Sequence, residues 1–473
     1  MPKCIINGKE AEFKPGENII EVAKRVGIYI PYYCYHPALS IVAQCRMCAV
    51  EIEKMPKLQT ACSTPATEGM IIKTTTERVK KNQRAIMEFL LLNHPLDCPI
   101  CDKSGECDLQ DFSFQYGDSF MRSSEERRTY VDLDIGGVIK KNMNRCIHCT
   151  RCLRFAEGVA EIHEMVAVKR GNNIEISTID DRPLETDYAG NYADICPTGS
   201  LSIKDFRFKK RVWYLKKTPT VCEGCSRGCN MEVHEERGTV YRCVPRVNLE
   251  INKYWLCDEG RFNFKYVNSE NRLTEPSIKS AQKFDFCDWS TAIEKSREFF
   301  QGKKTTVLVG SDLTQEEIKL ILDFIPKQIS VLSFFHYGTP GVLFSKDDGP
   351  ADRILKMKSK TSNLYGIEKL GLTGFEKYSP QTGAFLVFRG GRASVPDLGG
   401  IPTVGIGVFQ KTIIENFKII LPGTTFVEKD GTIFNFEGVE QKFKRAILPP
   451  GQSKNLSEIF MLWAHLGAAR RAA

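Results

Sequence analysis

The chain has 473 residues, of which 42% are hydrophobic and 26% charged, and its net charge is +8. This length supports several domains with hydrophobic cores. Because its 66 Lys and Arg are interspersed with 58 Asp and Glu, a dedicated nucleic-acid surface is not expected. Apolar runs such as 89–92 fall far below the roughly 18 residues of a membrane helix, so we expect no direct membrane span and any membrane link to run through a partner.

The first part of the chain predicts a hairpin followed by helices. Asn7-Gly8 stands between two short strand-like runs in segment 4–13, and this dipeptide is typical of a type I′ hairpin turn. Apolar residues at helical spacing predict a helix over 19–26 and a second one over 77–92. The second helix leads directly into a Cys-rich loop.

Beyond about residue 290 the pattern alternates between strands and helices, which is typical of an α/β domain. Thr314 and Glu317 form the signature of a capping box and open a helix that ends at Phe324. Gly390-Gly391 is interpreted as a turn rather than a phosphate cradle. Apolar runs predict strands over 306–309, 329–335, 384–388, 403–409 and 417–421.

Cysteine usage is the most informative feature of the chain, which has 18 Cys and 7 His. Disulfides need an oxidising compartment, and the sequence after Met1 lacks the charged and apolar segments of a secretion signal, so a cytoplasmic location is expected. Fifteen Cys and one His fall into four sets with metal-ligand spacing. Set one is Cys34-x10-Cys45-x2-Cys48-x13-Cys62, set two is His94-x3-Cys98-x2-Cys101-x5-Cys107, set three is Cys146-x2-Cys149-x2-Cys152-x43-Cys196, and set four is Cys222-x2-Cys225-x3-Cys229-x27-Cys257.

Sets one and three follow known iron-sulfur patterns. Set one places three Cys on one loop and the fourth on a separate strand, as plant-type [2Fe-2S] ferredoxins do, although its first gap is longer than theirs. Set three is the [4Fe-4S] run of bacterial ferredoxins, and because there is one such triplet, Cys196 is expected to close the same cluster. Arg145, Arg151 and Arg154 flank set three, where they either stabilise the reduced state or are simply solvated.

Sets two and four are less specific. The neutral imidazole of His94 would leave a cluster less negative and raise its potential, as His ligation does in Rieske centres. A structural zinc site also fits sets one and two by spacing, and for set two the spacing does not decide. In set four, Cys257 returns after a hairpin-like stretch. Cys243, Cys4 and Cys287 are expected to be core residues rather than ligands.

Segments His94–Asp102, Gly105–Asp111 and Arg145–Cys152 carry a resemblance to a known family. Over residues 1 to about 265 the sequence resembles the large iron-sulfur subunits (G subunits, 75 kDa type) of bacterial NADH:quinone oxidoreductase, or respiratory complex I. The resemblance implies that set two holds a [4Fe-4S] cluster rather than zinc.

A second resemblance concerns the C-terminal half. Segments 222–262 and 426–438 look like molybdopterin oxidoreductases. The chain after Cys257 is too short to enclose that cofactor, and no Cys stands where a molybdenum ligand is expected. This region is therefore expected to be a shortened scaffold without molybdopterin.

Together these resemblances imply an α+β multidomain fold with one [2Fe-2S] cluster on set one and three [4Fe-4S] clusters on sets two, three and four. The implied domains are a β-grasp [2Fe-2S] ferredoxin-like domain (1–76), a [4Fe-4S] domain with one His and three Cys ligands (77–137), a ferredoxin-like [4Fe-4S] domain (138–215), a [4Fe-4S] domain of molybdopterin-oxidoreductase type (216–275) and a truncated α/β scaffold (276–473).

The family implies a relay of electrons from a flavin-bearing, NADH-oxidising subunit toward quinone, on the cytoplasmic side of the bacterial inner membrane and together with other peripheral-arm subunits. Sets one, three and two would lie on this path and set four off it. No G-x-G-x-x-G follows a predicted strand, so neither an NADH site nor a catalytic residue is expected in this chain. The alternatives are an iron-sulfur subunit of an NAD-linked hydrogenase or formate dehydrogenase, and a colourless scaffold stapled by zinc.

Overall fold

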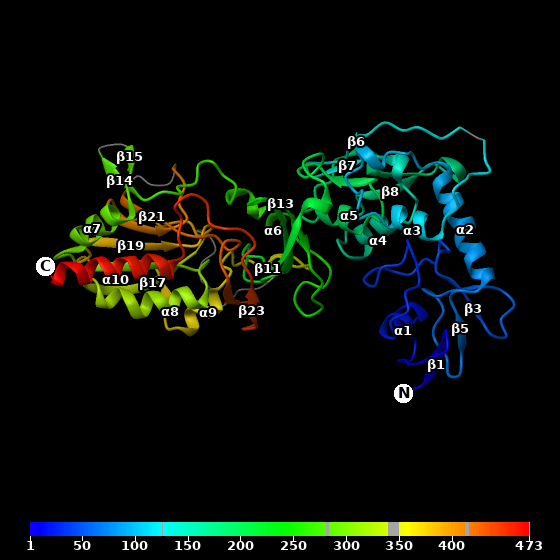
Figure 1. The fold of residues 1–473 in the computed structure, drawn as a ribbon, viewed down its shortest axis with the longest axis horizontal. Coiled ribbons are helices and arrows are strands. Elements are labelled where there is room, and N and C mark those ends of the chain that lie inside the picture. Colours follow the sequence, from blue (N-terminus) through cyan, green and yellow to red (C-terminus); the bar gives the residue numbers. More distant parts are fainter. Residues whose placement is uncertain (125, 281–282, 339–349, 412–415, 473) are drawn as a thin grey trace. The chain divides into compact units, whose positions relative to one another are not determined.

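The chain folds into two compact units in the computed structural model (Figure 1). Unit 1 is Met1–Tyr214 and unit 2 is Leu215–Ala473. No helix in the described part of either unit is long and apolar enough to cross a membrane. The finer division into five domains stays a prediction. The structure describes residues 1–124, 126–280, 283–338, 350–411 and 416–472.

Unit 1 begins with a five-stranded sheet of order β2-β1-β5-β3-β4. Strands β1 and β2 pair around Asn7 and Gly8, whose φ angles of 47° and 81° confirm the predicted type I′ turn. Strand β1 also pairs in parallel with β5, and helix α1 (Ile19–Arg25) packs on the sheet in a β-grasp arrangement. Gly27, at φ 72°, ends this helix slightly earlier than predicted. The strands are β1 (Lys3–Ile6), β2 (Lys9–Glu12), β3 (Ala49–Ile52), β4 (Gln59–Thr60) and β5 (Ile71–Lys73).

The rest of unit 1 consists of short helices around two small sheets. Helix α2 spans Glu77–Leu92, the predicted range, and the Thr76 hydroxyl caps it by accepting the Val79 N–H. The other helical elements are η1 (Cys98–Ile100), α3 (Asp108–Tyr116), η2 (Met143–Arg145), α4 (Arg151–Gly158), η3 (Gly171–Asn173), η4 (Ile179–Asp181), α5 (Gly190–Ile195) and η5 (Val212–Tyr214). The sheets are β10-β7-β6 and the pair β8-β9, with β6 (Leu133–Asp134), β7 (Ile139–Lys141), β8 (Met165–Val168), β9 (Glu175–Thr178) and β10 (Leu201–Ile203).

Unit 2 is built around an eight-stranded sheet of order β15-β14-β21-β20-β19-β16-β17-β18, parallel from β21 to β18. An antiparallel sheet β11-β12-β13 precedes it, and the hairpin β22-β23 follows. The strands are β11 (Lys216–Val221), β12 (Asn230–Glu236), β13 (Thr239–Pro245), β14 (Ser277–Ser280), β15 (Lys283–Phe286), β16 (Thr305–Gly310), β17 (Val331–Tyr337), β18 (Thr373–Gly374), β19 (Ala384–Arg389), β20 (Thr403–Gly407), β21 (Phe417–Pro422), β22 (Gly431–Phe434) and β23 (Glu440–Phe443).

The predicted elements of unit 2 are confirmed, with shifted ends. All five predicted strands are present, as β16, β17, β19, β20 and β21. Thr314 and Glu317 form the predicted capping box of α8. The helical elements are α6 (Asp258–Arg261), η6 (Asn263–Tyr266), α7 (Trp289–Phe300), α8 (Gln315–Phe324), η7 (Ile325–Lys327), α9 (Leu364–Lys369) and α10 (Leu456–Ala472).

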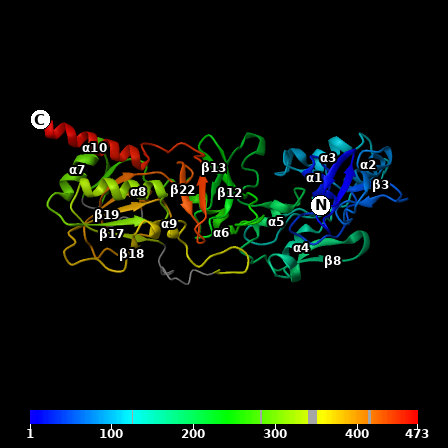
Figure 2. The same ribbon diagram turned by 90° about the horizontal axis from the view of Figure 1, so that it is seen from below.

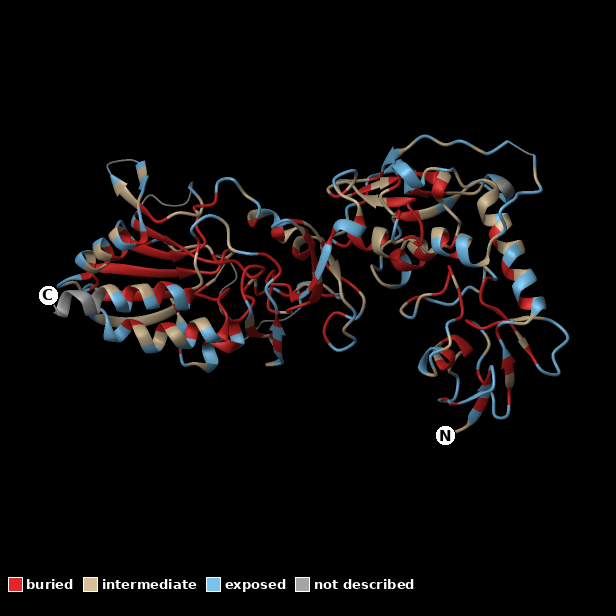
Figure 3. Ribbon diagram, in the orientation of Figure 1, coloured by how far each residue is buried: buried red, intermediate tan, exposed pale blue. Residues whose placement is uncertain are grey.

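Both faces of the parallel strands are buried, as Figure 3 shows for the middle of the sheet. Val307 and Val309 point into the core made with helices α7, α8 and α10, which lie on one side of the sheet (Figure 2). Leu308, between them, points into a second core on the opposite face. Two-sided burial explains why these strands read as continuous apolar runs in the sequence.

A buried ion pair in unit 2 joins the segment before β14 to the segment after β21. Arg272 donates two hydrogen bonds to the Glu428 carboxylate, at 2.6 and 2.7 Å, and a third to the Gly423 carbonyl. The side chains of Arg272 and Glu428 are 1% and 0% exposed. Glu428 also accepts the Thr425 N–H, so its charge is fully enclosed by donors.

Glu428→Gln is expected to destabilise unit 2 by about 3–5 kcal/mol, because the Arg272 guanidinium would stay buried without its charge partner. The matched control is Glu437→Gln at an exposed position, which should change stability by less than about 0.5 kcal/mol. Urea-dependent hydrogen exchange of unit 2 peptides in the full chain measures both. If unit 2 peptides were equally protected from hydrogen exchange in the Glu428→Gln and Glu437→Gln variants, the Arg272–Glu428 pair would have no stabilising role.

Candidate metal centres

Set one lies around the long loop between α1 and β3. Cys34, Cys48 and Cys62 are buried, and the Cys34 N–H points at the Cys45 sulfur at 3.5 Å. A hydrogen bond between the thiols of Cys34 and Cys45 raises the pKa of Cys34 and lowers that of Cys45 to about 5. A second bond pairs Cys48 with Cys62 and raises the pKa of Cys48. Cys62 lies in the turn directly after β4, which corrects the expectation that it stands on a strand.

Set two follows helix α2. His94 comes just after this helix, Cys98 opens η1, and Cys107 is the N-cap residue of α3. Burial lowers the pKa of His94 to about 4, so its imidazole is neutral, as a metal ligand requires. Its Nδ1 atom is buried and accepts or donates no hydrogen bond within the described residues. A neutral, buried imidazole nitrogen without a hydrogen-bond partner among the described residues is chemically suited to bind a metal.

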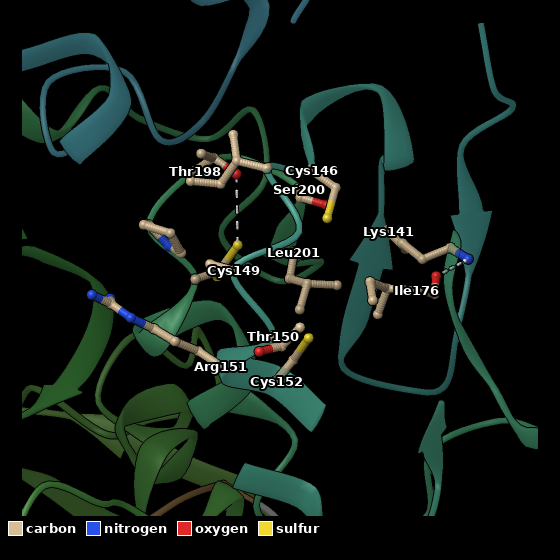
Figure 4. Close-up of a pocket in the computed structure, with 13 residues that line it drawn as sticks. Lys141, Cys146, Cys149, Thr150, Arg151, Cys152, Ile176, Thr198, Ser200 and Leu201 are labelled. Carbon is tan, nitrogen blue, oxygen red and sulfur yellow. Dashed lines mark hydrogen bonds between the residues drawn. The ribbon is translucent and has the colours of Figure 1, made fainter. Parts of the chain in front are cut away.

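Set three surrounds a single hollow, and its four thiols line it (Figure 4). Cys146, Cys149 and Cys152 come from the η2–α4 segment, and Cys196 ends helix α5. The hollow is small and partly open to solvent. Burial raises the pKa of Cys146 to about 12 and that of Cys149 to about 11, so both thiols are protonated at neutral pH unless a metal replaces the proton.

Set four gathers four buried cysteines in unit 2. Cys222, Cys225 and Cys229 form the loop between β11 and β12, and Cys257 is the N-cap residue of α6. The N–H groups of Gly224 and Gly260 donate to the sulfurs of Cys222 and Cys257 at 3.3 and 3.4 Å, respectively. Such bonds stabilise thiolate charge and are usual around iron-sulfur clusters.

The remaining cysteines lie in or against hydrophobic cores, as predicted. Cys243 lies in β13, is 1% exposed and faces the core, and Cys4 is buried in the N-terminal core. Cys287 is half-buried and packs against the core of unit 2. In the described part of the chain, no three His, Cys, Asp or Glu side chains converge on one point as ligands of a single ion.

Sets one, two and three lie next to one another within unit 1. Cys34, Cys107 and Cys149, one thiol from each set, belong to the same buried apolar cluster, together with Tyr33 and Phe112. The Cys107 thiol also donates to the Pro197 carbonyl at 3.6 Å, next to Cys196 of set three. A Cβ added at Gly199 would clash with the Cys101 sulfur, so the segment after Cys196 packs tightly against set two.

The sequence left the environment of Arg145, Arg151 and Arg154 undecided, and all three are buried in the structure. Arg145, Arg151 and Arg154 are only 4–7% exposed, which excludes the solvated interpretation. Arg145 pairs with Asp97, the residue before Cys98 of set two, at 2.9 Å. Arg151 donates to the carbonyls of Tyr35 and Ile195, beside ligands of sets one and three. In the sequence, the only sign of a role for these arginines was their position beside the Cys run of set three. Most of the groups that accept their hydrogen bonds lie far away in the sequence, so their burial was not predictable.

Comparison with known proteins places the chain among iron-sulfur subunits. The NADH-quinone oxidoreductase G subunit of Rickettsia bellii (strain RML369-C) is 40% identical over 330 residues, which cover 69% of this chain and 48% of that protein. The NADH-ubiquinone oxidoreductase 75 kDa subunit of Reclinomonas americana is 37% identical over 359 residues, which cover 75% and 52%. This chain belongs to their family. It spans about half the length of these curated relatives.

Family models match successive segments of this member of the 75 kDa-type family, and each of the four sets lies within one of them. They are described as 2Fe-2S iron-sulfur cluster binding domain (3–77), NADH-ubiquinone oxidoreductase-G iron-sulfur binding region (83–120), NADH-quinone oxidoreductase subunit 3, ferredoxin-like domain (136–202), Molybdopterin oxidoreductase Fe4S4 domain (215–269) and Molybdopterin oxidoreductase (407–462). The chain therefore contains both [2Fe-2S] and [4Fe-4S] binding domains, and the predicted fold class is confirmed.

A hydrogenase is among the solved structures that match this chain. It is an NAD+-reducing [NiFe]-hydrogenase in the H2-reduced state, at 28% identity and a TM-score of 0.39, covering 45% of this chain and 91% of that one.

Cys196→Ala is expected to abolish the cluster of set three and to leave the other cluster signals intact, because Cys196 is the one ligand of this set from helix α5. EPR of the reduced, anaerobically purified chain is the measurement. Cys287→Ala, which changes a cysteine outside the sets, is the control and should keep every signal. A Cys196→Ala variant with an unchanged set three signal would refute this ligand assignment.

Proposed function

We propose that this chain is an electron-transfer subunit of an NADH-quinone oxidoreductase, which passes electrons from NADH oxidation toward quinone. Sets one to four are its ligand sets, for one [2Fe-2S] and three [4Fe-4S] clusters. When bound, these clusters supply one-electron redox chemistry, and the chain supplies ligands, spacing and electrostatics. The names and the cluster-binding domains of its relatives support this function.

The observation that carries the proposal is the shared buried cluster in unit 1. Cys34, Cys107 and Cys149 each belong to a different set, and all three lie in that cluster. Arg154 bonds to residues of sets one and three, and Pro197 links sets three and two. This adjacency supports transfer in the order set one, set three, set two.

The surroundings of the sets support electron transfer rather than bond chemistry. Apolar side chains such as Met47, Met87 and Leu109 pack around the thiols of the shared cluster and keep water away. Low solvent access limits the reorganisation that accompanies a change of charge and tunes the potential of a metal site. No catalytic residue is assigned.

In unit 2, we infer a scaffold that holds set four but no molybdopterin. The N–H groups of Gly390, Arg392 and Ala393 follow β19 at the carboxyl edge of the sheet, where such folds bind ligands. All three donate to the carboxylate of Asp312, at 2.7–2.9 Å. A phosphate would have to displace this carboxylate, which supports the interpretation of Gly390-Gly391 as a turn. Set four then lies off the main electron path.

The partners follow from the same proposal. A flavin-bearing, NADH-oxidising subunit would donate electrons, other peripheral-arm subunits would accept them, and the membrane arm would be contacted indirectly. This assembly would place the chain on the cytoplasmic side of the bacterial inner membrane. Cys98 of set two is exposed, in contrast to the buried Cys101 and Cys107, which supports an electron exit at set two.

The anaerobically purified chain is expected to be brown and to contain about 14 iron and about 14 acid-labile sulfide per polypeptide, since a [2Fe-2S] cluster holds two of each and a [4Fe-4S] cluster four. Metal analysis and EPR of the reduced protein measure this. A colourless chain with substantial zinc, or fewer than three distinct reduced cluster signals, would overturn the proposed function.

His94→Cys is expected to keep the cluster of set two and to lower its potential, because a thiolate adds negative charge where the imidazole is neutral. An EPR-monitored redox titration measures the shift. His163→Cys, at an exposed position outside the sets, is the matched control and should leave all potentials unchanged. An unshifted potential in the His94→Cys variant would mean that His94 is not a ligand.

A further inference from the structure

The Arg154 side chain physically joins two of the ligand sets. It lies in α4, and its guanidinium reaches back to the loop of set one. Its Nη2 donates to the carbonyls of Cys34 and Cys149, at 2.5 and 3.1 Å, and its Nη1 donates to the carbonyl of Ser40 at 2.5 Å. One side chain therefore holds the backbone of a ligand from set one and of a ligand from set three.

The charge of Arg154 has no carboxylate partner within the described residues, where its Nε donates to the Thr150 hydroxyl and its other bonds end on carbonyls. Burial lowers the pKa of this guanidinium, and the neighbouring Cys34 and Cys149 oppose that effect. A guanidinium nevertheless stays protonated in proteins. A buried cation that faces only neutral oxygens needs a negative charge nearby, and thiolate-ligated clusters would provide one on each side.

We propose that Arg154 is a positioning residue that fixes the loops of sets one and three against each other and stabilises the reduced state of both clusters together. This inference rests on the proposed function, because it requires clusters at both sets. A cation next to two sites favours the extra electron on either, so it raises both potentials.

Two nearby cations differ from Arg154 in ways that a test can use. Lys141 is also buried, but it lines only the hollow of set three and donates to the Ile176 carbonyl at 2.9 Å. Arg145 is neutralised in part by Asp97. Only Arg154, among these three side chains, bonds to both Cys34 and Cys149.

The experiment is an EPR-monitored redox titration of the cluster-loaded full chain, with dithionite as reductant. Arg154→Gln removes the charge and Arg154→Lys keeps it but loses the forked donor. Lys141→Met removes a charge from set three alone. Arg182→Gln changes an arginine whose side chain is 76% exposed and serves as the surface control.

In Arg154→Gln, the ratio of oxidised to reduced cluster at a fixed potential should rise about tenfold for set one and for set three, which is a potential lower by about 59 mV in each. Arg154→Lys should lower both potentials by less than Arg154→Gln does. It keeps the charge, but an ammonium cannot bond to Cys34 and Cys149 in the same forked geometry. Lys141→Met should shift set three alone. Arg182→Gln should shift neither.

Unchanged potentials in Arg154→Gln, or a shift at one set only, would overturn the inference while the cluster signals themselves upheld the proposed function. If Arg154→Gln assembled neither cluster of sets one and three but kept that of set four, the positioning role would be supported, and Arg154→Lys would test the shared shift. If it also lost the cluster of set four, Arg154 would serve the fold in general and the inference would fail.

Discussion

Buried thiols and buried guanidinium groups in unit 1 depend on each other. Burial raises the pKa of Cys107 and Cys146 to about 12 each, so the metal-free thiols are neutral, and the arginines around them lack full compensation. Metal binding replaces thiol protons and turns each set into an anionic cage. The arginines then become its counter-charges. The buried arginines of unit 1 therefore fit the charge that the proposed clusters would carry better than the charge of protonated thiols.

Several residues next to the candidate ligands have a strained backbone conformation. Ala43 and Arg46, on either side of Cys45, have φ angles of 52° and 59°, and His148 and Thr150, on either side of Cys149, have 52° and 57°. Non-glycine residues rarely adopt this left-handed region, and the conformation costs free energy that the surroundings must offset. In both loops the left-handed residues lie next to a Cys-x2-Cys pair, and at set three the thiols line one hollow. The same device at sets one and three indicates a shared requirement of closely spaced ligands.

Local signals made much of this fold predictable, and long-range contacts did not. The Asn7-Gly8 turn and the Thr314 capping box depend on residues within a few positions, so the sequence shows them directly. The spacing of set three likewise predicted a group of four cysteines, and their thiols line one hollow. The burial of Arg154 was left open because its acceptor at Cys34 is 120 residues away, and a backbone carbonyl has no sequence signature. The sheet order of unit 2 was unpredictable for the same reason.

Two buried arginines, Arg154 in unit 1 and Arg272 in unit 2, differ in how their charge is compensated. In unit 1, Arg154 presents charge to neutral oxygens, which leaves its field available to the neighbouring sets. In unit 2, Glu428 neutralises Arg272, and Asp312 fills the ring of N–H groups after β19. A site that has to respond to an added electron keeps its charges uncompensated, whereas a scaffold satisfies them internally. By this criterion the uncompensated charge of Arg154 supports the redox relay proposed for unit 1, whereas in unit 2 the N–H groups at the carboxyl edge of the sheet are already occupied by Asp312.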